Sequence, residues 1–541
     1  MKTWLRRVYP LLFAIFPIIG VAANNPGYYR LVDVVVLSVI LIVAFALAYG
    51  VVYALLRIIM PGDRAADLAA LMTLLAVALF YLYEPLPLGA IKRWPVEHPV
   101  LFVVAAATVA VLVFVGKRRG MQRHLPTLAG AARFFTLAGT LVVCSSIARL
   151  IYYEINDVMA VRRSTLAREL ELPVPIRPAG KAQLANTNTN DPKRDIYVII
   201  LDEYAANEVY RENYGYDNSP FEDSLRALGF RIPQGLRSNY ANTLLSVTSM
   251  LNFAHVERLA DVMSPDSKDF SPAAYLMQHN RAERFLKSEG YRFVFFPSEW
   301  YAPTRENRDA DEQYNPYKHF SVGREIRRSW LAQYFATRTL FSKLLPYLPT
   351  EEEVDTDHAL RMFAGIPSVT DDPRPTFAFA HVLMPHIGYK ADAACKPLYY
   401  HPGIKGLPGE LHCLNTQVLT LVHALLADSR TPPIIILQGD HGSQSLKLFA
   451  NQSALPSIPQ ARERFRPFGA YYLPDGGAAA FPDSTSIVNV LRYVFSYYFN
   501  ADLPPLPNTM YYSHWMYPYR ITEVDANFHA ISPPRQQARG R

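Results

Sequence analysis

Two stretches that are far apart in the sequence each place an acidic side chain directly behind an apolar run. Residues 196–201 precede Asp202, and residues 434–437 precede Gln-Gly and then Asp440 and His441. Apolar, β-rich runs of this length predict buried strands. Because ligands bind where the strands of an open α/β sheet end, these carboxylates and the imidazole could supply oxygen and nitrogen ligands to a divalent metal.

An exposed turn with an incidental histidine would also explain the Asp-His-Gly stretch if it stood alone. Carboxylates gathered at one sheet edge repel one another unless a cation neutralises them, so two such stretches favour a metal. Glu203, which follows Asp202, could be a further ligand or an exposed side chain.

A threonine could supply the reactive oxygen. Residues 238–246, Ser-Asn-Tyr-Ala-Asn-Thr-Leu-Leu-Ser, lead into an apolar helical stretch. A threonine at a helix start can be an N-cap. The same position suits a nucleophile, because free N–H groups at a helix N-terminus hold phosphate oxygens and a nearby cation lowers the pKa of a hydroxyl. With metal-like neighbours, we expect Thr243 to be the nucleophile.

A further histidine follows another predicted strand. His386 comes just after the predicted strand at 375–383, so we expect it in the same crevice, where it could orient a phosphoryl oxygen or protonate a leaving group. His381 lies inside that strand and is interpreted as a packing residue.

These residues need a sheet to position them. The pattern predicts strands at 195–202, 228–233, 291–297, 375–383, 433–439 and 468–473, and helices at 219–228, 243–252, 280–289, 411–428 and 484–499. Alternating strands and helices predict a doubly wound, mostly parallel sheet with helices on both faces.

The chain of 541 residues carries a formal charge of +7, and half of its residues are hydrophobic. The apolar residues concentrate before about residue 155. Each apolar stretch there has the length that a bilayer demands, although the first alone could be a signal peptide. We therefore predict five membrane-spanning helices, at roughly 8–24, 33–58, 66–84, 99–116 and 130–153.

Basic residues predict the orientation of these helices. One side of the membrane would hold Lys2, Arg6, Arg7, Arg57, Arg64, Lys117, Arg118, Arg119 and Arg123, and the other only Arg30, Lys92 and Arg93. The N-terminus is thus expected in the cytoplasm, and everything after residue 153 outside it.

The expected domains are a transmembrane domain (1–155), a connector and linker (156–194), an α/β domain (195–515) and a C-terminal tail (516–541). Leucines at 166, 170 and 172 and nearby arginines could lay the connector along the membrane surface. Outside the cytoplasm, Cys395 and Cys413 are expected to form a disulfide. A metal pair is the alternative, but the two cysteines lack a Cys-x-x-Cys spacing.

Four motifs and a closing segment carry a resemblance to a known family. The chain resembles the sulfatase-like branch of the alkaline phosphatase superfamily, in particular the five-span lipoteichoic acid synthases and lipid A phosphoethanolamine transferases. The matching segments are IYVIILDEY (196–204), SNYANTLLSVTSMLN (238–252), HVLMPHIGY (381–389), IIILQGDHGS (434–443) and SIVNVLRYVFSYYFNADLPPL (486–506).

The resemblance implies a role for each motif residue. Asp202, Asp440 and His441 would be metal ligands, Thr243 the nucleophile that also touches the metal, and His386 a substrate contact. Sulfatases carry a Cys-Pro-Ser-Arg pattern at the nucleophile, with the cysteine oxidised to formylglycine. Here the Cys, Pro and Arg are absent, so formylglycine-dependent sulfate hydrolysis is not expected.

One departure concerns the number of metals. Phosphoethanolamine transferases have a further histidine after the Asp-His-Gly segment, whereas this chain offers Arg462 and Arg464. We therefore expect one divalent ion, Zn²⁺ or Mn²⁺, with both arginines binding the substrate phosphate. This leans toward the phosphoglycerol-transferring members.

The expected function is head-group transfer at the bacterial inner membrane, with the catalytic domain in the periplasm. A phospholipid would donate phosphoglycerol or phosphoethanolamine through a phospho-threonine intermediate to a glycan or lipid acceptor. No nucleic-acid partner is expected. The alternatives are a phosphate ester hydrolase of the same fold and a non-catalytic lipid-sensing or interaction protein.

Overall fold

The computed structural model describes residues 7–82, 125–177, 193–298, 302–317, 319, 321–343, 345–347, 350–399, 402–448 and 455–531. The chain divides into two compact units. The membrane unit comprises Met1–Asn25, Tyr29–Tyr152 and Gly323–Pro349, and the α/β unit comprises Pro26–Tyr28, Tyr153–Val322 and Thr350–Arg541. The expected span at 99–116, the linker at 186–192 and the tail beyond 531 lie outside the described residues.

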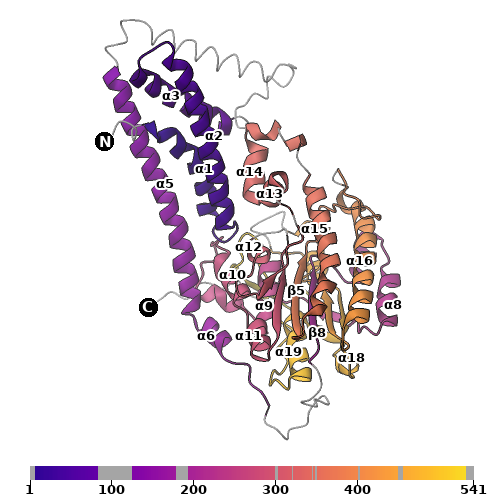
Figure 1. Ribbon diagram of the computed structural model, residues 1–541. Coiled ribbons are helices and arrows are strands. Elements are labelled where there is room, and N and C mark those ends of the chain that lie inside the picture. The colour runs from indigo at the N-terminus through magenta and orange to yellow at the C-terminus, as the bar shows by residue number, and fades with distance from the viewer. Residues whose placement is uncertain are drawn as a thin grey trace. The chain divides into compact units, whose positions relative to one another are not determined.

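Long apolar helices make up most of the membrane unit (Figure 1). They are α1 (Tyr9–Asn24), α2 (Leu31–Arg57), α3 (Gly62–Leu82) and α5 (Leu125–Arg162), which continues into the α/β unit. Among the described residues, α2, α3 and α5 are long and apolar enough to cross a membrane, while α1 has 16 residues. Four of the five expected spans thus coincide with helices, three of them of membrane-spanning length.

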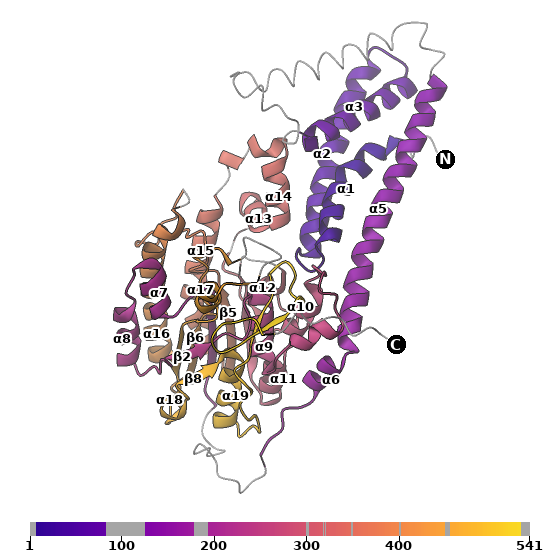
Figure 2. The same cartoon turned by 180° about the vertical axis from the view of Figure 1, so that it is seen from behind.

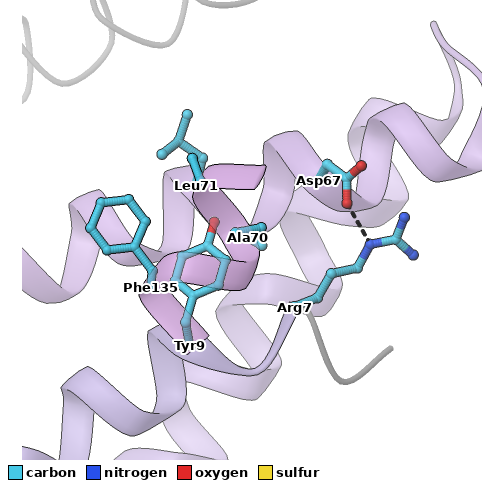
Figure 3. Close-up of a pocket in the computed structure, with 8 residues that line it drawn as sticks. Arg7, Tyr9, Asp67, Ala70, Leu71 and Phe135 are labelled. Carbon is cyan, nitrogen blue, oxygen red and sulfur yellow. Dashed lines mark hydrogen bonds and ion pairs between the residues drawn. The ribbon is translucent and has the colours of Figure 1, made fainter. Parts of the chain in front are cut away.

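An ion pair ties the start of α1 to the start of α3. Arg7 Nε donates to Asp67 Oδ1 over 2.7 Å, and its terminal nitrogen lies 3.0 Å from Asp63 Oδ1. Figure 3 shows the pair beside a small pocket that Tyr9 and Phe135 also line. The starts of α1 and α3 therefore lie at the same end of the helix bundle.

Six strands form the main sheet of the α/β unit, in the order β4-β3-β5-β1-β6-β7. Neighbouring strands are parallel except for β6 and β7. Their bounds are β1 Ile196–Leu201, β3 Arg292–Phe296, β4 Glu312–Gln313, β5 Thr376–Val382, β6 Ile434–Gln438 and β7 Gly469–Tyr472.

The strand predicted at 228–233 was wrong. Gly229 has a φ of 92°, which breaks an extended run, and Pro233 has no N–H to donate. Only Arg231 forms an isolated bridge, to Tyr471. The next residues form β2 (Gly235–Arg237), which pairs with β8 (Ser484–Ser486) in a separate small sheet.

Helices cover both faces of the main sheet (Figures 1 and 2), as expected for a doubly wound fold. Ile196, Val198 and Ile200 of β1 face a core formed by α9 (Thr243–Asn252), α10 (Ser271–Gln278), α11 (Arg281–Ser288) and α19 (Ile487–Tyr498). We call this side the α9 face. The alternate residues of β1 face α8 (Ser219–Ala227), α15 (Glu351–Gly365) and α16 (Leu407–Asp428).

Shorter elements complete the α/β unit: α6 (Thr165–Glu171), α7 (Asn207–Tyr214), α12 (Ala302–Arg305), α17 (Ile458–Arg464), α18 (Gly477–Ala480), β9 (Met510–Tyr512) and β10 (Thr522–Val524). Leu166 and Leu170 of α6 are buried in the core of the α9 face, so the connector packs on the α/β unit. Because β10 pairs with β9, the folded unit continues past the expected boundary at 515.

Candidate metal centre

The predicted ligands converge where β1 and β6 end. Side chains alternate between the faces of a strand, so Asp202 lies on the α9 face with Val198 and Ile200, and Asp440 occupies the same face beyond the end of β6. Ligand atoms of Asp202, Asp440 and His441 all lie within 4.8 Å of one another, and all three residues are buried. The structure therefore brings together the three metal ligands that the sequence predicts.

Gly439 and Gly442 flank Asp440 and His441 because the backbone is crowded there. A Cβ atom on Gly439 would lie 2.2 Å from the carbonyl oxygen of Tyr204, and one on Gly442 would lie 2.1 Å from that of Glu463. Only glycine permits so close an approach of two backbone segments. The glycines thus let the loop after β6 lie against the loop after β1.

The negative charge of Asp202 is unfavourable in its buried surroundings. Both of its carboxylate oxygens are buried, and neither has a hydrogen-bond partner among the described residues. Burial, followed by the charges of Asp440 and Glu203, raises the pKa of Asp202 well above its usual range. A buried carboxylate in this setting is what a bound cation would neutralise.

The tautomer of His441 follows from its contacts. Its Nδ1 lies 3.2 Å from the carbonyl oxygen of Gly442, so Nδ1 carries the proton and the Nε2 lone pair faces the cluster. That Nε2 lies 3.0 Å from Asp440 Oδ2 and 3.9 Å from Asp202 Oδ1. Oxygens gathered around an imidazole lone pair form a donor set that suits Zn²⁺ or Mn²⁺.

Asp440 is oriented by the backbone. Its Oδ1 accepts from the N–H of His441 over 3.0 Å and from that of Glu203 over 3.3 Å, which leaves Oδ2 toward the imidazole. Burial acts to raise the pKa of Asp440, but the interactions with His441 outweigh it and hold the pKa below its usual range. Asp440 is therefore ionised.

Thr243 is the first residue of α9 and is fully buried. The N-cap reading of this threonine was wrong: Asn242 is the cap, and its side chain accepts from the N–H of Leu245 over 3.1 Å. The Thr243 hydroxyl is thus not used by the helix end, and its Oγ1 lies 3.1 Å from His441 Nε2.

Two other hydroxyls of α9 have structural partners. Ser246 Oγ donates to the carbonyl oxygen of Asp440 over 2.6 Å, and Ser249 Oγ donates to that of Ala254 over 2.7 Å. The first of these bonds fastens α9 to the loop after β6. Of these three hydroxyls, that of Thr243 is the one whose oxygen lies against the imidazole.

Glu203 is buried, so of the two alternatives left open for it, an exposed side chain is wrong. Its Oε1 lies 2.8 Å from a terminal nitrogen of Arg464, and its Oε2 accepts from the N–H of Ile387 over 3.0 Å. The side chain of Gln444 also donates to it. Burial acts to raise the pKa of Glu203. The charges of His386 and Arg464 lower the pKa by more than burial raises it, so the carboxylate is ionised.

Arg464 links this carboxylate to the cluster. Its other terminal nitrogen lies 3.1 Å from His441 Nε2, and its Nε donates to the carbonyl oxygen of Ala241 over 2.7 Å. The guanidinium therefore lies beside the Thr243 hydroxyl and the imidazole, where a phosphoryl group would need positive charge.

Arg462 does not contact the cluster of Asp202, Asp440 and His441. Its side chain is 44% exposed and pairs with Glu212 over 2.7 Å. Both arginines belong to α17, and residues two apart on a helix point to different sides. We expected both arginines to bind the substrate phosphate; the structure brings Arg464 to the cluster and leaves Arg462 on the surface.

Two histidines lie in β5 or in the loop after it. His386 Nε2 lies 3.8 Å from Glu203 Oε1, so His386 contacts the cluster through that carboxylate. His381 is closer than expected of a packing residue: its Nε2 lies 3.5 Å from Asp202 Oδ2. Burial lowers the pKa of His381 to about 4, so the ring is neutral. His381 pairs with Ile200 in the sheet, two positions before Asp202, and this register brings its ring to Asp202. The register of β1 and β5 was not predicted from the sequence.

The expected disulfide is confirmed. Cys395 and Cys413 are bonded, with their Cα atoms 5.1 Å apart. The bond joins the loop after β5 to the buried first half of α16.

No family model and no curated protein matches this chain. Among solved structures, it is similar to the zinc-bound C-terminal periplasmic domain of EcEptC from Escherichia coli, at 14% identity over 62% of this chain and 94% of that chain, with a TM-score of 0.41. It is also similar to the integral membrane protein lipooligosaccharide phosphoethanolamine transferase A from Neisseria meningitidis, at 12% identity over 93% of this chain and 97% of that chain, with a TM-score of 0.35.

A third similar structure is the putative sulfatase yidJ from Bacteroides fragilis, at 14% identity over 59% of this chain and 77% of that chain, with a TM-score of 0.35. The three structures are thus two of phosphoethanolamine transferase proteins and one of a putative sulfatase.

Proposed function

We propose that this protein is a membrane-anchored, metal-dependent transferase that moves a phospholipid head group to a glycan or lipid in the cell envelope. The convergence of Thr243 with Asp202, Asp440 and His441 is the observation that supports the proposal. A hydroxyl, two carboxylates and an imidazole from separate parts of the chain meet at one buried point.

One divalent ion fits these residues. Asp202 offers two oxygens that no described donor satisfies, Asp440 offers Oδ2, and His441 offers its Nε2 lone pair. When bound, Zn²⁺ or Mn²⁺ would lower the pKa of the threonine hydroxyl and withdraw charge from the phosphoryl oxygens. A terminal nitrogen of Arg464 lies 3.1 Å from the same Nε2, and its positive charge would balance that of a phosphoryl group bound beside Thr243.

The proposed reaction has two halves. In the first, Thr243 Oγ1 forms a bond to the lipid phosphorus, and the bond from phosphorus to the diacylglycerol oxygen breaks. The hydroxyl proton of Thr243 ends on that diacylglycerol oxygen, with His386 as the group that delivers it. The phospho-threonine is held at the N-terminus of α9 and by the charge of Arg464.

In the second half, an acceptor hydroxyl attacks the phosphorus. The bond from phosphorus to Thr243 Oγ1 breaks, and the acceptor's proton returns to the threonine oxygen. Because Thr243 is buried, bulk water is kept from this ester, which favours a transferase over a hydrolase.

The membrane helices would hold this site beside its lipid donor and so raise the effective concentration of that donor. We propose five spans with the α/β unit in the periplasm of a bacterial inner membrane. Phosphoglycerol and phosphoethanolamine are the proposed head groups, and a cell-envelope glycan or lipid is the proposed acceptor.

Mass spectrometry of the full-length protein tests this function. The protein in lipid nanodiscs is incubated with a phospholipid that carries a fluorescent acyl chain, with and without an acceptor sugar, and then digested. We expect fluorescent diacylglycerol and a phosphodiester adduct on the peptide that contains Thr243. Release of diacylglycerol at an equal rate without acceptor would show a hydrolase, and the absence of both adduct and bound metal would show a non-catalytic protein.

A further inference from the structure

A segment from the second half of the chain belongs to the membrane unit. The chain leaves the α/β unit after Val322 and returns to it at Thr350. Between these points lie α13 (Val322–Arg328), α14 (Trp330–Arg338) and the short helices η5 (Leu340–Lys343) and η6 (Leu345–Tyr347). The contacts of this segment explain why it belongs to the membrane unit.

One face of α14 packs on the membrane-spanning helices. Leu331 and Phe335 are buried in the same cluster as Ile18 of α1 and Leu41 of α2. The ring of Phe335 lies 5.9 Å from that of Tyr81, edge to face. This face of α14 is therefore part of the interior of the helix bundle.

The contacts also show which end of the bundle α14 occupies. Tyr81 lies in the last turn of α3, and Tyr29 directly precedes α2; successive antiparallel helices bring these two ends together. Burial and the neighbouring Tyr334 raise the pKa of Tyr29 to about 12, while Arg338 acts to lower it. With the N-terminus in the cytoplasm, this end of the bundle is the outer one.

The same segment also exposes aromatic and apolar side chains. Tyr334 is 38% exposed, Leu340 44% and Tyr347 84%. The exposed guanidinium of Arg338 lies 4.3 Å from the centre of the Tyr334 ring. No carboxylate among the described residues forms an ion pair with Arg338, so its charge is open to an outside partner.

The composition and surroundings of this surface indicate the partner. Residues 323–349 contain Arg324, Arg327, Arg328, Arg338 and Lys343 against Glu325 as the only acidic residue. Aromatic rings with basic side chains are typical of the level of lipid head groups. Exposed apolar side chains of α2, among them Val32, Val35 and Val36, continue the surface along the bundle.

We propose that α14 and the turn after it form a phospholipid-binding surface in the outer leaflet, where Arg338 holds the phosphate of an anionic lipid beside Tyr334. This site lies in the membrane unit and shares no residue with the metal cluster. It does not depend on the proposed head-group transfer, because a hydrolase or a lipid sensor could use the same surface.

Spin labels measure whether the surface lies in lipid. The exposed free Cys144 is first replaced by serine, and a nitroxide is attached to Leu340→Cys or Tyr347→Cys in full-length protein in nanodiscs. Tyr399→Cys, at a 68% exposed tyrosine of the α/β unit, is the matched control. Dissolved oxygen partitions into the bilayer, and a water-soluble nickel complex stays outside it.

We expect oxygen to relax the labels at 340 and 347 more than nickel does, and the reverse at 399. Nickel accessibility at 340 and 347 as high as at 399 would overturn the proposal. Neither result uses Thr243 or the metal, so this test and that of the transferase fail independently.

Arg338 is tested by native mass spectrometry of the full-length protein with equal amounts of phosphatidylglycerol and phosphatidylcholine. We expect Arg338→Ala to reduce the preference for phosphatidylglycerol by about fivefold, and Arg338→Lys to retain most of it. Arg374→Ala, at an exposed arginine of the α/β unit, is the control. An unchanged preference in Arg338→Ala would remove Arg338 from the site.

Discussion

The hydroxyl oxygen of Thr243 lies 3.1 Å from Nε2 of His441, although 198 positions separate the two residues. The bond from Ser246 Oγ to the carbonyl oxygen of Asp440 fastens the first turn of α9 to the loop that carries the histidine. The N-terminus of α9 and the end of β6 are thus held together. Small changes in either segment should shift the hydroxyl oxygen of Thr243 relative to His441.

Thr243→Ala should reduce turnover by a factor of about 10³ or more, because it removes the oxygen proposed to bond to phosphorus. Release of fluorescent diacylglycerol measures this. Ser249→Ala removes a hydroxyl of the same helix that donates to a backbone carbonyl, and it should keep most of the activity. Wild-type turnover in Thr243→Ala would contradict the nucleophile assignment.

His441→Ala should lose bound metal, because it removes the nitrogen from the proposed ligand set of Asp202, Asp440 and His441. Elemental analysis of the purified protein measures the metal content. Added Zn²⁺ at 100 times its dissociation constant should stabilise the wild-type protein by about 2.7 kcal/mol and the variant far less. His412→Ala, at an exposed histidine of α16, is the control. Equal metal content in His441→Ala and wild type would remove His441 from the ligand set.

Arg464→Ala should lower kcat by about 10²-fold, because a buried positive charge beside the phosphoryl group is lost. It should also lower the thermal unfolding temperature, since Glu203 is left buried without its partner. Arg462→Ala, at the exposed arginine of the same helix, should change neither quantity appreciably. Equal effects of the two substitutions would contradict the placement of Arg464.

Glu410→Gln should remove one source of pH dependence in stability. Burial raises the pKa of Glu410 from its ordinary 4.5 to about 7, although the N–H groups of Ala391 and Lys390 act to lower it. The fold therefore favours the protonated acid: this stability is present below pH 4.5 and is lost as the pH rises to about 7.

The free energies of unfolding of Glu410→Gln and the wild type should thus diverge in favour of the variant across that interval, by up to about 3 kcal/mol. Denaturant titrations at several pH values measure the difference. A difference that does not change with pH would show that Glu410 is ionised throughout.

Loss of the disulfide should destabilise the α/β unit. Cys395 and Cys413 close a loop of 18 positions, for which chain entropy suggests about 3 kcal/mol. Cys413→Ser should therefore unfold at lower denaturant concentration than the wild type, whereas Cys144→Ser should not. An unchanged midpoint for Cys413→Ser would contradict a stabilising role of the bond.

Hydrophobic patterning was sufficient to predict most of the elements. The runs at Ile196–Leu201 and Ile434–Gln438 are buried on both faces and read as strands, and α9 was predicted with its observed bounds. The run at 228–233 failed because Gly229 has a positive φ and Pro233 cannot donate, which apolar content alone does not reveal.

Residue types and spacing show which chemistry is available: carboxylates and an imidazole behind strands, a threonine at a helix start, and Cys395 with Cys413. How these side chains face one another depends on the packing of the α/β unit. It buried Glu203 against Arg464, turned Arg462 away and brought His381 to Asp202. Local pattern fixes which face of a strand or helix a residue occupies, but the partner across that face comes from a distant part of the chain and is set by packing.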